Sequence, residues 1–562
     1  MLTLLQINVT ANWGSTGKIA EQIGLCAQAH GWKSYIAYGR MMNPSMNELI
    51  KIGNTFDVYE HYAEARLLDN EGVASRRATR RLLQRMDEIQ PDVVHLHNIH
   101  DHYLNYPILF RYLADKKIPV VWTQHDIWSL SGHCDTNLLG CEKWKTECKE
   151  CPAIGRWSLD RSERNFKLKK ELLAAIPSLT IIPVSDWLAG MIKESHLGVR
   201  SIQVIKNGID LNVFRPLDKD VRKRFGIPTS KRIVLGVAMP WSERKGLPDF
   251  LKLYDMLETD KYQILLVGLT KAQIAELPQG IIGIERTSSA LDLAEIYSAS
   301  DVFVNTTYYD NYPTTNLEAM ACGTPVITYN TGGSPEAVDV QTGAVVEQGD
   351  LAGLKREIER LANGNYHDAC LARASDLFDN NKCFDKYIKI YSDLIGGGKF
   401  VVIGVSSVWH DGKGLHEFIQ LSQNPAFQVV LVGVKEEQKA SLPKEIIAVT
   451  RTNSQAELAL YYSFADVLVN PTYADSFPTV NMESLACGTP VITYDTDGSP
   501  EIINDKTGIV VEKGNFNALQ DAIIKMKDKP LSSADCRKRA EEHFEKDKCF
   551  EEYIELYESL LK

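Results

Sequence analysis

A long internal repeat constrains the fold of this 562-residue chain more than any other feature. The segment Gly236-Val-Ala-Met-Pro-Trp returns 168 residues later as Gly404-Val-Ser-Ser-Val-Trp. Further on, 29 of the 48 residues in 299–346 are identical to their counterparts in 464–511. Solenoid repeats are about 20–50 residues long, so a repeat of this length indicates a duplicated domain and not a repeat array.

Short apolar runs alternate with helical segments throughout the chain. Strands are expected at 232–237, 263–267, 301–305 and 324–329, with helices at 247–257, at 290–298 and from Thr314 onward. In the N-terminal part, strands are expected at 2–9, 34–38, 93–97, 120–123, 180–184 and 202–206. Such runs are typical of parallel strands buried on both faces. The sequence therefore predicts an α/β fold of three Rossmann-like, doubly wound modules, at 1–215, 216–396 and 397–562. A flexible glycine run, 396–398, is expected to join the second module to the third.

Composition narrows the class of protein. The chain is 44% hydrophobic and 24% charged, which excludes a disordered or fibrous protein, and its net charge of −11 argues against a nucleic-acid binder. No apolar run reaches the roughly 18 residues of a membrane span, and the first residues are typical of a strand and not of a signal peptide. We therefore expect a cytoplasmic enzyme.

Loops after the carboxyl ends of strands are where such sheets bind ligands. The first strand ends in Asn12-Trp-Gly14-Ser-Thr-Gly17-Lys18, where small residues and a helix start favour an anion; a tight turn is the alternative. The fourth ends in Thr-Gln-His125-Asp, which places an imidazole at the same edge.

The repeated domain carries paired carboxylates, Asp310-x7-Glu318 and Asp475-x7-Glu483. A helix that begins near Thr314 leaves Asp310 on the loop and Glu318 about one turn inside, so both can accept hydrogen bonds from one polyhydroxylated ligand. A solvated helix with an N-terminal acid is the alternative.

Taken together, these motifs resemble those of retaining glycosyltransferases of family 4, which have the GT-B architecture of two facing Rossmann-like domains. The resemblance covers the whole chain if the last 165 residues count as a second copy of the C-terminal domain, and it is greatest to bacterial capsular and colanic-acid-type polysaccharide transferases. The matching pieces are the Gly14–Lys18 loop, Thr-Gln-His125-Asp, Asn207-Gly-Ile-Asp, Lys245-Gly, Asp310-x7-Glu318 and Ala-Cys322-Gly-Thr-Pro-Val.

The resemblance implies a nucleotide diphosphate sugar donor, a glycan or lipid-linked acceptor, and transfer with retention of configuration, without a protein nucleophile, catalytic metal or cofactor. It implies catalytic roles for His125, Lys245, Asp310 and Glu318, with Lys245 at the diphosphate, Glu318 at the ribose, and Asp310 and His125 at the sugar. The implied donor-binding residues are Gly14, Gly17, Asn207, Arg244, Asn311 and Thr315. Family members usually place an arginine five or six residues before the lysine; here Met239 and Pro240 stand there, and Arg244 is the substitute.

The duplication raises the question of which copy is active. We favour the first, because the helix expected at 383–394 can return to the N-terminal domain. The second keeps Lys413, Asp475 and Glu483. It therefore binds a nucleotide sugar, acts with the N-terminal domain of another subunit, or only packs or dimerises.

Four cysteines crowd one segment, Cys134, Cys141, Cys148 and Cys151. Four thiolates with a C-x2-C pair suit a structural zinc, with His133 as a substitute ligand. Unliganded thiols and two disulfides are the alternatives.

The only dense basic run is Arg76-Arg77-Ala-Thr-Arg80-Arg81-Leu-Leu-Gln-Arg85. On a helix it forms a cationic face beside Leu82, Leu83 and Met86, and we expect either peripheral contact with the inner face of a membrane or a solvated surface. A GT-B epimerase or hydrolase of nucleotide sugars and a non-catalytic nucleotide-sugar binding protein are the competing functions. The oligomeric state is left open.

Overall fold

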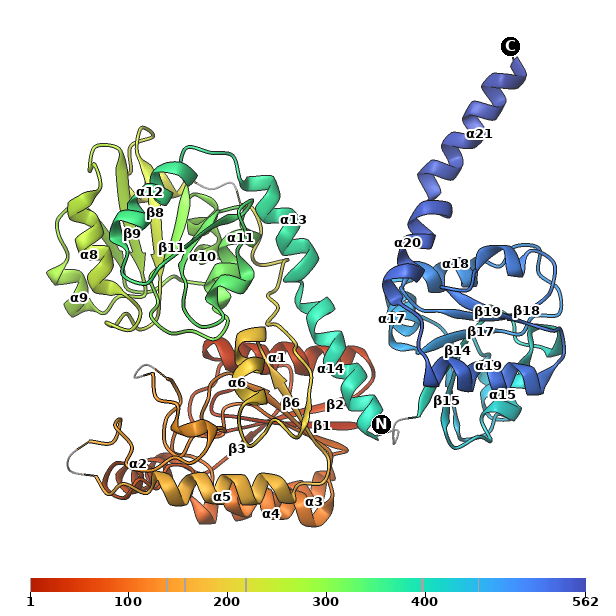
Figure 1. Cartoon of the computed structure of the whole chain (residues 1–562), viewed down its shortest axis with the longest axis horizontal. Coiled ribbons are helices and arrows are strands. Elements are labelled where there is room, and N and C mark those ends of the chain that lie inside the picture. Colours follow the sequence, from red (N-terminus) through yellow and green to blue (C-terminus); the bar gives the residue numbers. More distant parts are fainter. Residues whose placement is uncertain are drawn as a thin grey trace. The chain divides into compact units, whose positions relative to one another are not determined.

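The computed structural model describes residues 2–137, 140–155, 158–217, 220–395, 399–452 and 454–561 (Figure 1). It divides into two compact units, one ending at Tyr391 and the other beginning at Ser392. The glycine run at 396–398, and with it the expected junction between the second and third modules, lies outside the described residues.

The first part of unit 1 is a parallel sheet in the order β3-β2-β1-β4-β5-β6-β7. Its elements are β1 (Thr3–Asn8), α1 (Gly14–Ala29), β2 (Lys33–Tyr38), β3 (Glu48–Lys51), α2 (Thr55–Leu68), α3 (Arg76–Ile89), β4 (Val93–Leu96), α4 (Tyr106–Lys116), β5 (Val120–Gln124), η1 (Lys143–Lys145), α5 (Ser162–Ala175), β6 (Leu179–Pro183), α6 (Asp186–Lys193) and β7 (Ser201–Ile202). We call this part the N-terminal domain.

The rest of unit 1 is a second parallel sheet, in the order β10-β9-β8-β11-β12-β13. Its elements are α7 (Val221–Phe225), β8 (Arg232–Val237), α8 (Leu247–Met256), β9 (Tyr262–Val267), α9 (Lys271–Glu276), β10 (Ile281–Ile284), α10 (Ala290–Ser298), β11 (Val302–Asn305), α11 (Thr314–Ala321), β12 (Val326–Tyr329), η2 (Ser334–Ala337), β13 (Gly343–Val346), α12 (Leu351–Leu361), α13 (His367–Leu377) and α14 (Asn380–Ile395).

Unit 2 repeats that strand order, as β16-β15-β14-β17-β18-β19, again with parallel pairs. Its elements are β14 (Phe400–Val405), η3 (Asp411–Lys413), α15 (Leu415–Leu421), β15 (Phe427–Val432), α16 (Glu436–Lys439), β16 (Ile446–Val449), α17 (Gln455–Phe464), β17 (Val467–Asn470), α18 (Thr479–Ala486), β18 (Val491–Tyr494), η4 (Ser499–Ile502), β19 (Gly508–Val511), α19 (Phe516–Asp528), α20 (Ser533–His543) and α21 (Lys546–Leu561).

The predicted fold class, three Rossmann-like units with parallel sheets, is confirmed. The central strands are fully buried, as the apolar runs indicate, whereas three outer strands of unit 1, β3, β10 and β13, were not predicted. The strand expected at 202–206 is only the two-residue β7.

Helix α14 returns the chain to the N-terminal domain, as expected, and lies beside α1 (Figure 1). Tyr387 shares a hydrogen bond of 2.8 Å with the hydroxyl of Thr123, and Tyr391 bonds to Nδ1 of His95 at 2.5 Å. A side chain at Gly208 would clash with Asn380, because its Cβ would stand 2.6 Å from that Cα atom. The backbone at Gly208, in the segment that links the two domains, is therefore in direct contact with the backbone at the start of α14.

No helix within the described residues combines the length and the apolar character needed to cross a bilayer.

Candidate active site

The expected site residues of unit 1 lie where strands of both its domains end. His125 follows β5 directly, and α1 begins at Gly14, beyond β1. Lys245 lies between β8 and α8, and Asp310 lies between β11 and α11. These positions are the carboxyl ends of parallel strands, the edge at which doubly wound sheets bind ligands.

Lys245 and Asp310 form an ion pair, with 2.7 Å between Nζ and Oδ2. Each side chain is 24% exposed, so the pair lies at the surface of the site and not in its core. The two loops are joined by their backbones as well, because the amide of Tyr308 donates to the carbonyl oxygen of Arg244 at 2.8 Å. The side chain of Arg244 is exposed.

Glu318 lies in the first turns of α11, one turn inside the helix, as expected. Burial raises the pKa of its carboxyl group, against the opposing effects of the positive charge of Lys18 and of a 3.1 Å hydrogen bond from Tyr297. Lys18 belongs to α1 of the N-terminal domain, so the charges of the two domains interact at this carboxylate. The glycines of the Gly14–Lys18 loop were singled out from the sequence, but this lysine was given no role.

Asn311, in the loop between β11 and α11, also joins the two domains. Its amide nitrogen donates to the carbonyl oxygen of His125 at 2.6 Å. Its Oδ1 atom is buried and accepts no hydrogen bond from the described residues. A buried amide oxygen without a donor is costly unless a ligand or water supplies one.

The imidazole of His125 belongs to a buried hydrogen-bonded chain whose tautomers can be assigned. Gln6 donates its amide to the carbonyl oxygen of Ala20, so its Oε1 atom faces His97 and accepts from Nε2 of that ring. Nδ1 of His97 is then an acceptor, and Nε2 of His125, 3.1 Å away, must donate to it. Burial lowers the pKa of His125 to about 4, so the ring is neutral and its Nδ1 atom has a free lone pair.

The remaining expected residues of unit 1 differ in what surrounds them. A Cβ at Gly14 would meet no atom within 4 Å, whereas one at Gly17 would lie 2.6 Å from the hydroxyl of Thr10, so Gly17 serves the packing of α1. The amide of Asn207 donates to the carbonyl oxygen of Tyr312 at 3.3 Å, and Thr315 is half-buried at the start of α11.

Glu336 makes a further contact between the domains that the sequence did not suggest. Its carboxylate accepts from the backbone amides of Asp186 and Trp187, at 3.0 and 2.7 Å, at the start of α6. Lys206 lies 2.9 Å from the same carboxylate. A carboxylate at a helix N-terminus satisfies free amides and complements the helix dipole, so this contact holds the two domains together.

Unit 2 reproduces the carboxylate arrangement of the first copy. Lys413 Nζ lies 2.7 Å from Asp475 Oδ2, and Tyr462 donates to Glu483 at 2.8 Å. Asn311, which contacts the N-terminal domain in the first copy, corresponds to Ser476.

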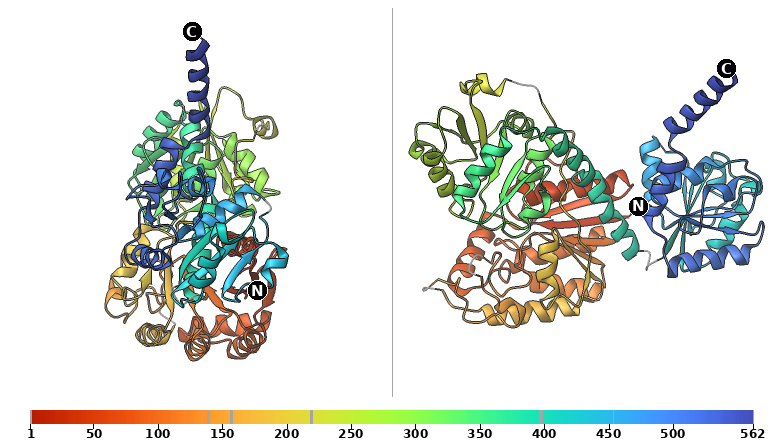
Figure 2. Two further views of the ribbon diagram at one scale, coloured as in Figure 1. Left: turned by 90° about the vertical axis from the view of Figure 1, so that its right-hand side faces the viewer. Right: turned by 45° about the horizontal axis from the view of Figure 1, so that its top comes forward.

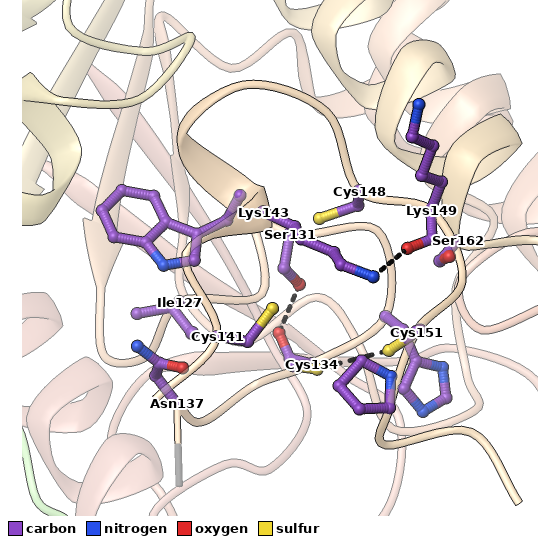
Figure 3. Close-up of a pocket in the computed structure, with 13 residues that line it drawn as sticks. Ile127, Ser131, Cys134, Asn137, Cys141, Lys143, Cys148, Lys149, Cys151 and Ser162 are labelled. Carbon is purple, nitrogen blue, oxygen red and sulfur yellow. Dashed lines mark hydrogen bonds between the residues drawn. The ribbon is translucent and has the colours of Figure 1, made fainter. Parts of the chain in front are cut away.

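The four clustered cysteines line one pocket of the N-terminal domain (Figure 3). The sulfur atoms of Cys134 and Cys151 are 3.9 Å apart, and those of Cys141 and Cys148 face the same space. Among the described residues, no three of these sulfurs lie within 4.8 Å of one another. His133 also lines the pocket, and its Nδ1 atom bonds to Asp69 at 2.6 Å.

A second group with metal-ligand chemistry, Cys26, His30 and Asp385, lies between α1 and α14, with one ligand atom of each within 4.8 Å of the others. The thiol of Cys26 donates to Asp385 at 3.2 Å, and burial raises its pKa. A protonated thiol bonded to a carboxylate accounts for this group as a contact that fastens α14 to the N-terminal domain.

Comparison with known proteins accounts for most of the chain. Residues 22–213 match the model for Glycosyltransferase Family 4, and residues 231–364 and 392–543 each match a model for Glycosyl transferases group 1. The two group 1 matches fall on the two similar sheets.

Individual relatives point the same way. The chain is 23% identical over 428 residues to a putative colanic acid biosynthesis glycosyl transferase, WcaC, of Escherichia coli K12, covering 70% of this chain and all of that protein. It is 30% identical over 200 residues to the capsular polysaccharide biosynthesis glycosyltransferase CapM of Staphylococcus aureus, covering 33% of this chain and 51% of that one.

Among solved structures, sucrose-phosphate synthase from Thermosynechococcus elongatus shares the fold, with a TM-score of 0.54 and 17% identity over 71% of this chain and all of that one. The chain therefore belongs to the group 1 and family 4 glycosyltransferases and has their GT-B fold.

Proposed function

We propose that the protein transfers a sugar from a nucleotide diphosphate sugar to a glycan or lipid-linked acceptor, with retention of configuration, in the synthesis of a cell-surface polysaccharide. The observation that carries this proposal is the contact of Asn311 with His125 across the two domains of unit 1, directly beside the ion pair of Lys245 and Asp310. The names of the relatives that make colanic acid and capsular polysaccharide support the class of product.

Each group has a role that fits its surroundings. Lys245 neutralises the departing diphosphate, and Arg244, which is exposed beside it, is a second cation for the same charge. Asp310, released from Lys245, accepts hydrogen bonds from sugar hydroxyls. Glu318 accepts from the ribose. Gly14 leaves open space for a phosphate, and Thr315 and the start of α11 offer further donors.

His125 and Asn311 act on the sugar as acceptors. The free lone pair on Nδ1 of His125 and the unpaired Oδ1 atom of Asn311 suit hydroxyl donors. A neutral imidazole contributes no positive charge, so the electrostatic stabilisation of the diphosphate falls to Lys245 and Arg244. These two cations would neutralise the negative charge of the diphosphate, which in other enzymes a divalent ion neutralises. We therefore propose transfer without a catalytic metal.

Transfer of labelled sugar tests this proposal. With a panel of nucleotide diphosphate sugars and lipid-linked glycan acceptors, label should move to an acceptor without added Mg²⁺ or Mn²⁺, and the product's anomeric coupling constant should match that of the donor. Release of free sugar alone would identify a hydrolase. Binding of a donor without turnover would identify a binding protein, and either outcome would contradict the proposal.

For the cysteine pocket we propose a structural zinc ion. Two thiolates on one tetrahedral zinc are about 3.8 Å apart, close to the 3.9 Å between Cys134 and Cys151. Cys141 and Cys148 line the same pocket and would supply the other two thiolates. If His133 replaces one of them, its Nε2 atom is the ligand, because Asp69 holds Nδ1. The ion would order the segment that follows His125, on the acceptor side of the site.

The basic helix α3 fits a peripheral contact with an anionic membrane. Its arginines are exposed, its buried residues include Leu82 and Met86, and Leu83 is partly buried. Arg81 is partly neutralised by Asp57, 3.6 Å away. Vesicles containing phosphatidylglycerol should co-sediment with the chain at low salt, and the change Arg76→Glu with Arg80→Glu should abolish this. Equal binding by that variant would contradict the contact.

A further inference from the structure

Helix α21 has a broad apolar face that none of the described residues of unit 2 covers. In Figures 1 and 2 it projects from the rest of that unit as a single helix. Its large apolar side chains are between 51% and 88% exposed: Phe550, Tyr553, Ile554, Leu556, Tyr557, Leu560 and Leu561. They recur at the spacing of a heptad stripe, which places them on one side of the helix.

Helix α14 shows what this face is suited to do, because it is the counterpart of α21 in the first copy. Its residues Phe384, Tyr387, Ile388, Ile390 and Tyr391 are at most 5% exposed, whereas their counterparts in α21 are at least 51% exposed. In α14 these side chains pack on the N-terminal domain, against residues such as Trp32 and His95. The face therefore belongs to a helix that packs against protein.

The two helices differ mainly on their other sides. Cysteine, phenylalanine, isoleucine, leucine and both tyrosines of the face are the same in α21 as in α14. Lys386 and Lys389, which lie away from the face, correspond to Glu552 and Glu555. The two helices therefore share the packing face, and the opposite side of α21 is the more acidic.

A second copy of the chain cannot offer α21 the surface that α14 occupies. In every copy that surface is already covered by the copy's own α14, which is connected to it in the same unit and therefore has a high effective concentration. Two copies have two such surfaces and four such helices. When both α14 helices occupy their own surfaces, the two α21 faces remain uncovered. Each can then pack against the other.

We propose that two copies of the chain associate through the apolar faces of their α21 helices, packed antiparallel. Seven side chains exposed to this degree offer on the order of 800 Å², about what one partner of a standard interface buries. An antiparallel pair brings Lys546 at the start of one helix toward Glu558 near the end of the other, whereas a parallel pair would set the two Glu558 side chains side by side. An anionic membrane is disfavoured as the occupant by the glutamates of this helix.

Sedimentation equilibrium of the full chain over a range of concentrations tests this proposal, which does not depend on the proposed function. The wild-type chain should form a dimer, and the double change Tyr553→Glu with Tyr557→Glu should leave a monomer. Ser559→Glu adds one such charge away from the stripe and should remain dimeric. Sugar transfer should be unchanged in all three, because none of these residues belongs to the site of unit 1.

Two results would overturn the interface. One is a wild-type chain that is monomeric throughout, whether or not it binds lipid vesicles or another protein through Tyr553 and Tyr557. The other is a dimer that the double change does not weaken. Circular dichroism of the variants shows whether the rest of the fold is intact.

Discussion

Lys245 and Asp310 are joined by an ion pair of 2.7 Å in the first copy of the repeated domain, and Lys413 and Asp475 form the same pair at the same distance in the second. A carboxylate therefore holds, in each copy, the cation proposed to meet the diphosphate. Under the proposed function, binding of a donor should release the pair of unit 1, because phosphate would attract Lys245 and sugar hydroxyls would donate to Asp310.

Removing the cation of the first copy should impair chemistry more than binding. We expect Lys245→Ala to lower kcat about a hundredfold or more, the usual cost of losing one group that stabilises developing charge. Lys413→Ala is the matched control and should transfer sugar at the wild-type rate. Steady-state kinetics with a saturating acceptor measures both, and equal losses in the two variants would contradict the assignment.

Asn311 should matter mainly for binding of the sugar. Asn311→Ala removes the unpaired Oδ1 acceptor and the bond to the backbone of His125, so KM for the donor should rise about tenfold, the effect of one or two hydrogen bonds. Ser476→Ala, at the corresponding position of unit 2, should leave KM unchanged. A KM equal to that of the wild type would exclude this residue from the donor site.

The half-buried imidazole of His125 should make unit 1 sensitive to acid. Its pKa is lowered from 6.5 to about 4 chiefly by burial, so the unfolded chain binds more protons between these values. Its contribution to stability is present above pH 6.5 and is lost as pH falls toward 4, by at most about 3 kcal/mol.

Urea unfolding at pH 7.5 and pH 4.5 measures this loss. His125→Asn should show a smaller loss of stability between the two values than the wild-type chain. His367→Asn, an exposed histidine of the same unit, should behave as the wild type does. An identical pH dependence for His125→Asn would show that this ring is not the source.

The cysteine pocket should bind one zinc ion per chain. Inductively coupled plasma mass spectrometry should find the metal in protein purified without chelators and should lose it in Cys134→Ser and Cys148→Ser. Cys549→Ser, outside the pocket, should keep it. Metal-free protein with four thiols that react with Ellman's reagent would contradict the site, as would metal-free protein whose thiols appear only after reduction.

Much of the fold could be predicted because its signals are local. Runs such as Tyr-Gln-Ile-Leu-Leu-Val in β9 are buried on both sides, and burial on both sides makes a strand continuously apolar. The edge strand β3, Glu-Leu-Ile-Lys, has exposed ends and only half-buried residues between them, so its sequence resembles a loop.

The site could be predicted only in part, because its contacts join distant segments. The positions of Asp310 and Glu318 followed from where α11 begins. The effect of Lys18 on Glu318 and the capping of α6 by Glu336 depend on how the two domains of unit 1 close, and neither has a signal in its own segment. The close approach of Gly17 to Thr10, whose hydroxyl would lie 2.6 Å from a Cβ at position 17, also had no signal in the sequence.

The central claim is that the N-terminal domain and the first copy of the repeated domain form the transferring site. Separate Glu318→Ala and Glu483→Ala variants, assayed for donor binding and for transfer of labelled sugar, test it most directly. Transfer and donor binding by unit 1 should be lost in Glu318→Ala, and transfer should be kept in Glu483→Ala. Loss of transfer in Glu483→Ala with transfer intact in Glu318→Ala would contradict the account.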